Sequence, residues 1–175
     1  GPGFGGSCFP KDLEALLSIS KNNDLTMETV KAASVANINQ KKRMTDKLIN
    51  LFDNNLKNRK IAVLGLAFKA NTDDVRESTA IDMLNVILDH KGIVNAYDPF
   101  ANDEMYKIFN DIEYYNNVYD AVKGVDGIVI MTEWNEFRSL DLKRIKNIMR
   151  GNIVLDTRNI LNMDELSSLG FTYDN

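Results

Sequence analysis

Short apolar runs that alternate with helical patterns are the feature that most constrains this fold. Four such runs fit strands that are buried on both faces, and they lie at 61–65, 93–97, 127–131 and 153–155. Helical patterns and two weaker strands fill the intervals, with helices at 79–90, 102–109, 117–123, 138–149 and 163–169 and strands at 112–115 and 171–173. Regular alternation of strand and helix predicts an α/β fold, a doubly wound, Rossmann-like parallel sheet. We expect the strand order 3-2-1-4-5-6.

A long helical pattern precedes this sheet. After a short helix predicted over 11–21, apolar residues recur at steps of three and four from Thr26, a candidate N-cap, to about Asn54. Such a helix is about 40 Å long at 1.5 Å per residue. One small domain cannot cover that length, so we expect its apolar face to pack on a second copy of the chain or on another domain. A plain core helix is the alternative reading.

The polar stretch 54–58 separates the two patterns. We therefore divide the chain into residues 1–56, a glycine-rich loop with a helical segment, and residues 57–175, the sheet domain. The net charge of −4 argues against a nucleic-acid partner, and no apolar run is long enough to span a membrane. A single cysteine permits no internal disulfide and favours the cytoplasm, and no residues have the spacing of metal ligands.

The first dozen residues carry the candidate chemistry. Four glycines precede Cys8, the only cysteine, and Pro10 favours a helix that starts just after it. The positive end of a helix dipole stabilises a thiolate, the nucleophilic form of cysteine. Lys11 adds a cation nearby, and Asp12 adds a carboxylate that could orient water or accept a proton. The pattern indicates covalent catalysis, and the alternative is that Cys8 is a small buried hydrophobe.

The turn after the first predicted strand lacks a dinucleotide fingerprint. Only Gly65 of the Gly-x-Gly-x-x-Gly pattern is present, so we expect the principal NAD site to lie elsewhere. Asp98 follows the second strand, and we interpret its Asp-Pro pair as a turn. Lys69 and Arg158 follow strands whose carboxyl ends share one edge of the sheet, and Arg76 lies near the next helix N-terminus. Three cations around one crevice suit a phosphorylated ligand.

Several motifs resemble those of the NAD-dependent nucleotide-sugar dehydrogenases, which oxidise a sugar CH2OH to a carboxylate. The similar segments are Gly5 to Asp12 (GGSCFPKD), Leu64 to Lys69 (LGLAFK), Asp73 to Ser78 (DDVRES) and Asp156 to Asn159 (DTRN, where the family pattern has DGRN). Ser-Cys-Phe-Pro-Lys-Asp is most similar to the UDP-glucose branch. The GDP-mannose enzymes tend to have leucine after the cysteine, and the UDP-N-acetylmannosamine enzymes have histidine in place of the serine.

The resemblance implies roles for individual residues. Cys8 would be the nucleophile, forming a thiohemiacetal and then a thioester with the sugar, and Asp12 would handle water. Substrate contacts would come from Phe4, Gly5, Phe68, Lys69 and Arg158. NAD contacts would come from Cys8, Phe9, Pro10, Lys11 and Arg76.

The resemblance also implies partners. It begins in the middle of the family's sequence, so we expect an N-terminal NAD-binding domain outside these residues, an inactive chain on its own, and a homodimer formed through the long helix. Alternatives are another nucleotide sugar as the substrate, or a dimerising nucleotide-binding module without catalysis.

Overall fold

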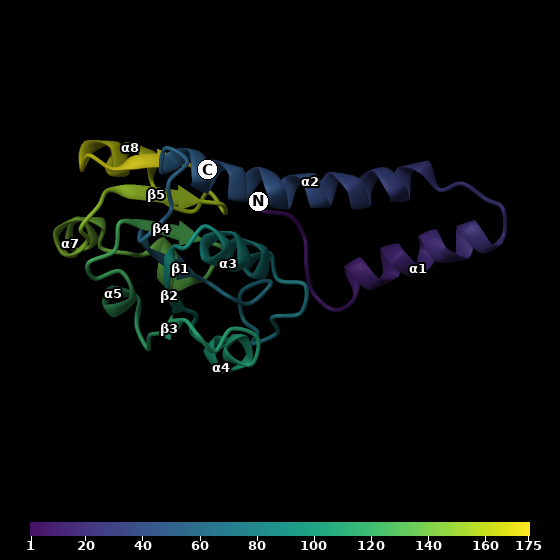
Figure 1. Cartoon of the computed structure of the whole chain (residues 1–175), viewed down its shortest axis with the longest axis horizontal. Helices are drawn as coiled ribbons and strands as arrows, with labels where there is room; N and C mark the ends of the chain where they lie inside the picture. The colour runs from purple at the N-terminus through teal and green to yellow at the C-terminus, as the bar shows by residue number, and fades with distance from the viewer.

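A six-stranded, fully parallel sheet forms the body of the molecule (Figure 1). The computed structural model describes residues 1–175. Its strand order is β3-β2-β1-β4-β5-β6, which confirms the predicted order 3-2-1-4-5-6. The strands are β1 (Lys60–Leu64), β2 (Ile93–Tyr97), β3 (Glu113–Tyr114), β4 (Gly127–Ile130), β5 (Ile153–Asp156) and β6 (Thr172–Asp174).

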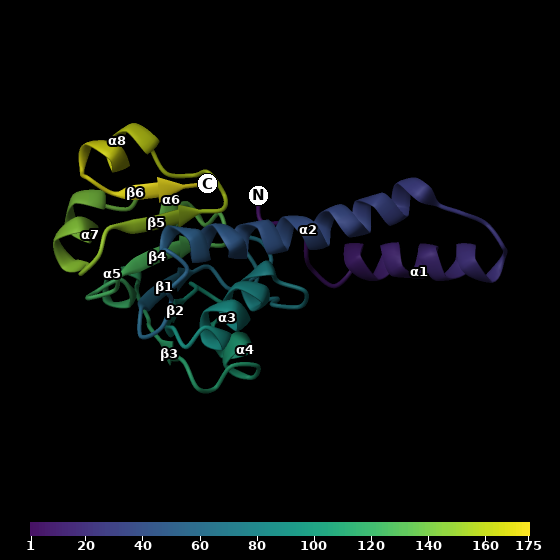
Figure 2. The same ribbon diagram turned by 45° about the horizontal axis from the view of Figure 1, so that its top comes forward.

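Helices cover both faces of this sheet (Figures 1 and 2). The eight helices are α1 (Phe9–Asn22), α2 (Glu28–Leu51), α3 (Thr79–Asp89), α4 (Asn102–Tyr106), α5 (Val118–Ala121), α6 (Asn135–Arg138), α7 (Leu142–Ile148) and α8 (Met163–Ser168). Part of α2, α3 and α4 share one apolar core with the sheet, while α5 to α8 share a second core. None of the helices combines the length and the apolar character that crossing a membrane requires.

The alternation of side chains along β1 separates the two cores. Ile61 and Val63 point into the core beneath α2 and α3, whereas Ala62 and Leu64 point into the core beneath α5 to α8. All four side chains are fully buried. A strand covered on both faces must be apolar at every position, which is why this stretch is a continuous apolar run in the sequence.

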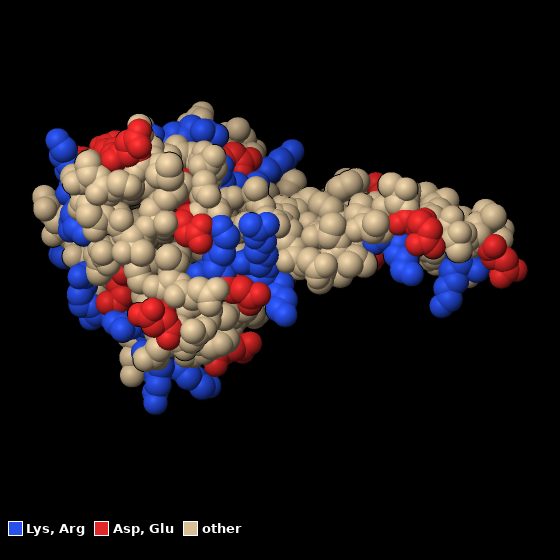
Figure 3. All heavy atoms as spheres, turned by 90° about the horizontal axis from the view of Figure 1, so that it is seen from above, with Lys and Arg blue, Asp and Glu red and all other residues tan.

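The first two helices form an arm that extends away from the body (Figures 1 and 2). We define the arm as residues 9–40, which include α1 and the first half of α2. Its apolar side chains are largely uncovered, with exposed fractions of 57% at Ile19, 61% at Leu25 and 63% at Ile38. Figure 3 shows that the arm is a narrow extension whose charged side chains gather toward its far end. The predicted long helix is therefore present, and its first half is not a core helix within this chain.

Two local predictions differ from the structure. The helix predicted over 138–149 is divided into α6 and α7, because the Asp141 side chain accepts a hydrogen bond from the backbone N–H of Arg144 and caps a new helix. Thr26 is not the N-cap of the long helix, since α2 begins after Met27, which makes no side-chain cap bond.

Candidate functional site

Cys8 lies at the N-terminus of α1 with its thiol exposed to solvent. It occupies the N-cap position and Pro10 stands in the first turn, as the sequence predicts. The alternative of a buried, hydrophobic cysteine is therefore wrong. Asp12 follows one helical turn later, and its backbone N–H donates to the Cys8 carbonyl over 2.9 Å. Its carboxylate is also exposed, 3.5 Å from the Lys11 ammonium, and such a surface pair adds little stability.

The glycine-rich loop before Cys8 packs directly against the loop that follows β1. The Gly6 N–H donates to the Arg76 carbonyl over 3.0 Å. A Cβ atom at Gly5 would lie 2.0 Å from the Glu77 carbonyl oxygen, and one at Gly6 would lie 2.8 Å from the Phe68 ring. Gly6 also has a φ of +90°, which side chains disfavour. Only glycine permits this approach at both positions, so the loop carrying Cys8 is held against the sheet domain.

Two amide side chains of α2 hold the start of the same loop. Asn37 accepts from the Phe4 N–H over 2.7 Å and donates to the Phe4 carbonyl over 3.1 Å. Gln40 donates to the Gly1 carbonyl over 2.8 Å. The Phe4 and Phe9 rings are 4.6 Å apart, centroid to centroid. Sequence reasoning missed Asn37 and Gln40, and the only signal was an asparagine in a helix interior, where its propensity is poor.

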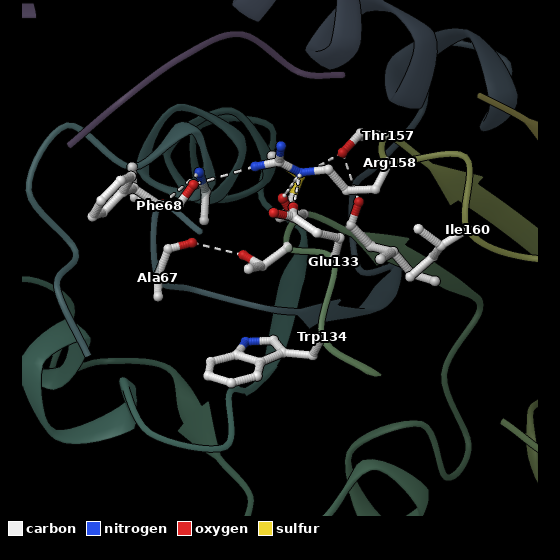
Figure 4. A network of polar contacts seen from close by, with 12 residues as sticks. Ala67, Phe68, Glu133, Trp134, Thr157, Arg158 and Ile160 are labelled. Carbon is white, nitrogen blue, oxygen red and sulfur yellow. Dashed lines mark hydrogen bonds and ion pairs between the residues drawn. The ribbon is translucent and has the colours of Figure 1, made fainter. Parts of the chain in front are cut away.

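Arg158 is the most constrained of the three predicted cations (Figure 4). Its Nε donates to the Met131 carbonyl over 2.7 Å, and its Nη2 donates to the Phe68 carbonyl over 3.3 Å. A carboxylate oxygen of Glu133 lies 3.1 Å from Nε. Burial lowers the pKa of Arg158, while the nearby Glu133 charge acts in the opposite direction. Nη1 has no such carbonyl partner and faces the glycine segment, where a Cβ at Gly1 would lie 3.8 Å away.

The loop that carries Arg158 is organised by Asp156. This buried carboxylate accepts hydrogen bonds from the backbone N–H groups of Arg158, Ile160 and Leu161. Thr157, which stands where the family pattern has glycine, donates its hydroxyl to the Ile130 carbonyl over 2.7 Å. Its φ is not positive, so this backbone accommodates threonine without the strain that glycine would relieve.

The backbone N–H groups of the turn after β1 are already hydrogen-bonded to the side chain of Asp98. This carboxylate, 2% exposed, accepts five N–H hydrogen bonds, from Leu66, Ala67 and the Trp134 indole on one oxygen and from Phe100 and Ala101 on the other. The Leu66 and Ala67 N–H groups are those that a dinucleotide-binding turn would offer to a pyrophosphate. The turn does not fit that role, and the interpretation of Asp98 as a turn former is confirmed.

Lys69 and Arg76 line two separate depressions and Arg158 lines neither, so the three cations do not surround one crevice as predicted. Lys69 reaches over the Phe68 ring, 5.3 Å from its centroid, and lines a depression of about 430 Å³ with Glu133 and Trp134. Arg76 is exposed and makes paired hydrogen bonds of 2.9 and 2.8 Å to Asp74, which lower the pKa of Asp74. Arg76 lines a second, open depression of about 320 Å³ together with Ser7, Pro10, Lys11 and other residues of that loop. The structure thus brings Phe68, Arg76 and Arg158 against the loop that contains Phe4 and Gly5, while Lys69 lies over the Phe68 ring.

Comparison with known families decides the relationship. Residues 62–163 match the UDP binding domain of the UDP-glucose/GDP-mannose dehydrogenase family, and residues 1–41 match the central domain of the same family. The chain belongs to this family. The contact between Gly6 and Phe68 therefore joins a central-domain segment to the UDP binding domain.

Individual members of the family are similar along the whole chain. A UDP-glucose 6-dehydrogenase of Rickettsia bellii is 43% identical over 175 residues, which cover 99% of this chain and 40% of that protein. The structure of a UDP-glucose dehydrogenase from Pyrobaculum islandicum gives a TM-score of 0.83 at 31% identity, over 100% of this chain and 38% of the other. The structure of a UDP-D-ManNAc dehydrogenase from Pyrococcus horikoshii gives a TM-score of 0.82 at 30% identity, over 99% of this chain and 38% of the other. The chain thus spans about 40% of the length of the curated relatives it matches.

Proposed function

We propose that this chain is the central and UDP-binding part of an NAD-dependent UDP-glucose 6-dehydrogenase, which oxidises UDP-glucose to UDP-glucuronate. One observation carries the proposal: the loop that presents the exposed Cys8 thiol docks on Phe68 and on the 76–77 backbone of the UDP binding domain. A thiol and a nucleotide site must be close together if the sulfur is to reach the sugar of a bound nucleotide sugar. The identity to UDP-glucose 6-dehydrogenases over nearly the whole chain supports the choice of substrate.

Cys8 supplies the nucleophile in the second half of the reaction. Its thiolate adds to the C6 aldehyde, and the oxygen takes a proton to give a thiohemiacetal. Loss of a hydride from C6 and a proton from oxygen leaves a thioester, and water then releases the carboxylate and the free thiol. Asp12, one turn away on α1, orients this water or accepts its proton. Because the sulfur retains the aldehyde between the two oxidations, a reactive intermediate does not escape.

The nucleotide is held by groups from both segments. Arg158 has unused N–H groups directed toward the glycine segment, which suits a phosphate or hydroxyl oxygen. Phe68 and Lys69 add an aromatic face and a second cation, while Phe4 and Gly5 border the sugar from the loop.

NAD accepts each hydride when bound. The turn after β1 does not fit it, since Asp98 occupies the N–H groups there. We therefore infer that its principal contacts come from a further domain outside residues 1–175. Phe9, Pro10, Lys11 and Arg76 would meet the cofactor from this side, beside Cys8, and two of them are cations suited to its phosphates.

The same proposal assigns the remaining parts of the chain. Residues 1–56 form the catalytic loop and the dimerisation arm, and residues 57–175 form the UDP-sugar domain. The uncovered apolar side chains of the arm pack on a second copy, which makes the protein a homodimer. Without the further domain, this chain alone is catalytically inactive.

Substitution of the nucleophile in the full-length protein tests the proposal. Cys8→Ser should reduce the NAD-dependent formation of UDP-glucuronate by about a thousandfold or more, since serine is a far weaker nucleophile at neutral pH. Ser7→Ala is the matched control, because it removes the hydroxyl that shares a hydrogen bond of 3.7 Å with the Cys8 sulfur but leaves the nucleophile in place, so its effect should be far smaller. Normal turnover by Cys8→Ser would refute the covalent role.

The same assay distinguishes the substrate. The similarity to the Pyrococcus horikoshii UDP-D-ManNAc dehydrogenase makes UDP-N-acetylmannosamine the second candidate. Oxidation of that sugar, or of GDP-mannose, in preference to UDP-glucose would keep the chemistry and reassign the substrate.

A further inference from the structure

The carboxylate of Glu133 lies beside Arg158 without forming a hydrogen bond to it (Figure 4). Glu133 Oε2 is 3.1 Å from Arg158 Nε, but the Nε–H donates to the Met131 carbonyl over 2.7 Å. Oε2 is sealed from solvent and has no hydrogen-bond donor. Native proteins rarely leave a buried carboxylate oxygen in this state, so its presence needs a reason.

Glu133 compensates the charge of Arg158 but does not set the orientation of its guanidinium. The direction of the guanidinium is already fixed by two backbone carbonyls, those of Met131 and Phe68. The Arg158 side chain is only 17% exposed, and a cation removed from water to that degree requires a counter-charge. Glu133 provides it, which offsets the cost of burying the guanidinium and helps to hold it in place when no ligand is bound.

The Glu133 side chain also reaches the edge of an open depression. Glu133 lines the depression of about 430 Å³ that also contains Lys69, and its side chain is 34% exposed. Arg158 itself does not line this depression, and its free Nη1 faces the glycine segment. Because Glu133 Oε2 lies only 3.1 Å from Arg158 Nε, an anion bound at the guanidinium is attracted by the cation and repelled by a carboxylate a few ångströms away. Glu133 therefore keeps the Arg158 guanidinium in position and also limits how tightly Arg158 can bind an anion.

We propose that Glu133 is an affinity-determining residue, a resident counter-anion of Arg158 that weakens the binding of nucleoside diphosphates at this edge of the sheet. The inference rests on the proposed function, in which a UDP group binds at Arg158. It goes beyond that function because it assigns a role to a residue that opposes binding. Its consequence is faster release of the nucleotide product than Arg158 alone would allow.

Removing the charge of Glu133 tests the proposal, because the proposal and a purely structural role predict opposite changes in affinity. Glu133→Gln in the 175-residue chain should bind UDP and inorganic pyrophosphate about tenfold more tightly by isothermal titration, because removal of a negative charge several ångströms from the ligand removes a repulsion of that size. A purely structural role for Glu133 predicts the opposite, weaker binding by a disturbed Arg158. Glu133→Asp keeps the charge and should bind much as the wild type does.

Two further variants separate the pair from the general charge of the depression. Glu136→Gln removes another carboxylate of the same depression, one that accepts from the Tyr97 hydroxyl at 3.0 and 3.1 Å, and should change the affinity by less than about threefold. Glu133→Gln combined with Arg158→Gln should lose the gain entirely, since the effect acts through the guanidinium.

Each result decides the inference. Equal or weaker binding by Glu133→Gln, a gain that survives in the double variant, or failure of Glu133→Gln to fold would overturn it. In the full-length protein the same substitution should lower the inhibition constant of UDP about tenfold. If UDP-glucose is not oxidised but the affinity changes occur, the proposed function fails and the role of Glu133 stands. If turnover is normal and the affinity changes are absent, only the role of Glu133 fails.

Discussion

Replacement of Asp98 by asparagine tests the most heavily bonded side chain in the protein. Its two carboxylate oxygens accept five N–H hydrogen bonds of 2.7 to 3.1 Å, and together these connect the ends of β1, β2 and β4. Asparagine has nearly the same shape but replaces one acceptor oxygen with an NH2 donor. In either orientation of the amide, that donor faces at least two N–H groups, which it cannot satisfy.

The magnitude follows from those lost bonds. A hydrogen bond to a charged acceptor is worth about 1.5–3 kcal/mol, so loss of two lowers the free energy of unfolding by about 3–6 kcal/mol. Small domains are stable by only about 5–15 kcal/mol, and this loss is therefore a large share of the total. With an m-value of about 2 kcal/mol/M in urea, the unfolding midpoint should fall by about 1.5–3 M.

Equilibrium unfolding in urea measures this directly. Trp134 is the only tryptophan and donates its indole N–H to Asp98, so its fluorescence reports on the site, and far-UV circular dichroism reports on the whole fold. Asp46→Asn, at an exposed position of α2, is the matched control and should change stability by less than about 0.5 kcal/mol. A loss below about 1 kcal/mol for Asp98→Asn would refute the reasoning.

Two other regions give predictions of different kinds. Burial raises the pKa of Asp126, but hydrogen bonds from Arg150 and from the Lys60 N–H lower it by more than burial raises it. The folded pKa of Asp126 is therefore below its usual value. Such a group stabilises the fold above its unfolded pKa of about 3.9 and loses that effect as the pH falls through its folded pKa. Asp126→Asn should therefore lower the urea midpoint at pH 7, and its deficit relative to wild type should shrink as the pH falls below that unfolded value; an equal deficit at every pH would contradict this. If the arm forms the proposed homodimer, Ile38→Glu should shift it toward monomer in sedimentation equilibrium, whereas Met163→Glu, a similarly exposed apolar position on α8, should not.

The strand order could be predicted because it depends on features that are local in the sequence. Each central strand is a continuous apolar run, and right-handed crossovers leave few ways to arrange six such strands with helices between them. The division between α6 and α7 was missed because Leu140 continues the apolar pattern across the break. The signal was Asp141, a good N-cap residue in the middle of an apparent helix.

The site could be predicted only in part. The places of Cys8, Phe68 and Arg158 follow from a helix start and from strand ends, which the sequence marks. The bonds from Asn37 to Phe4 and from Asp98 to Leu66 join residues 33 and 32 positions apart, and no local pattern specifies them. Glu133 also follows a strand end at the same edge of the sheet, but the sequence does not show that its carboxylate meets Arg158, which follows a different strand.

The helix α2 has a role that extends beyond covering the sheet. Met44, Leu48 and Phe52 fix its second half in the core, while Asn37 and Gln40 in its first half hold the loop that leads to Cys8. The helix contains neither glycine nor proline, so it has no hinge. Because the helix is continuous, the side chains packed in the body and the amides that hold the Cys8 loop belong to one rigid element. In the proposed function, the position of the Cys8 loop relative to Arg158 is thus set in part by side chains that belong to neither of them.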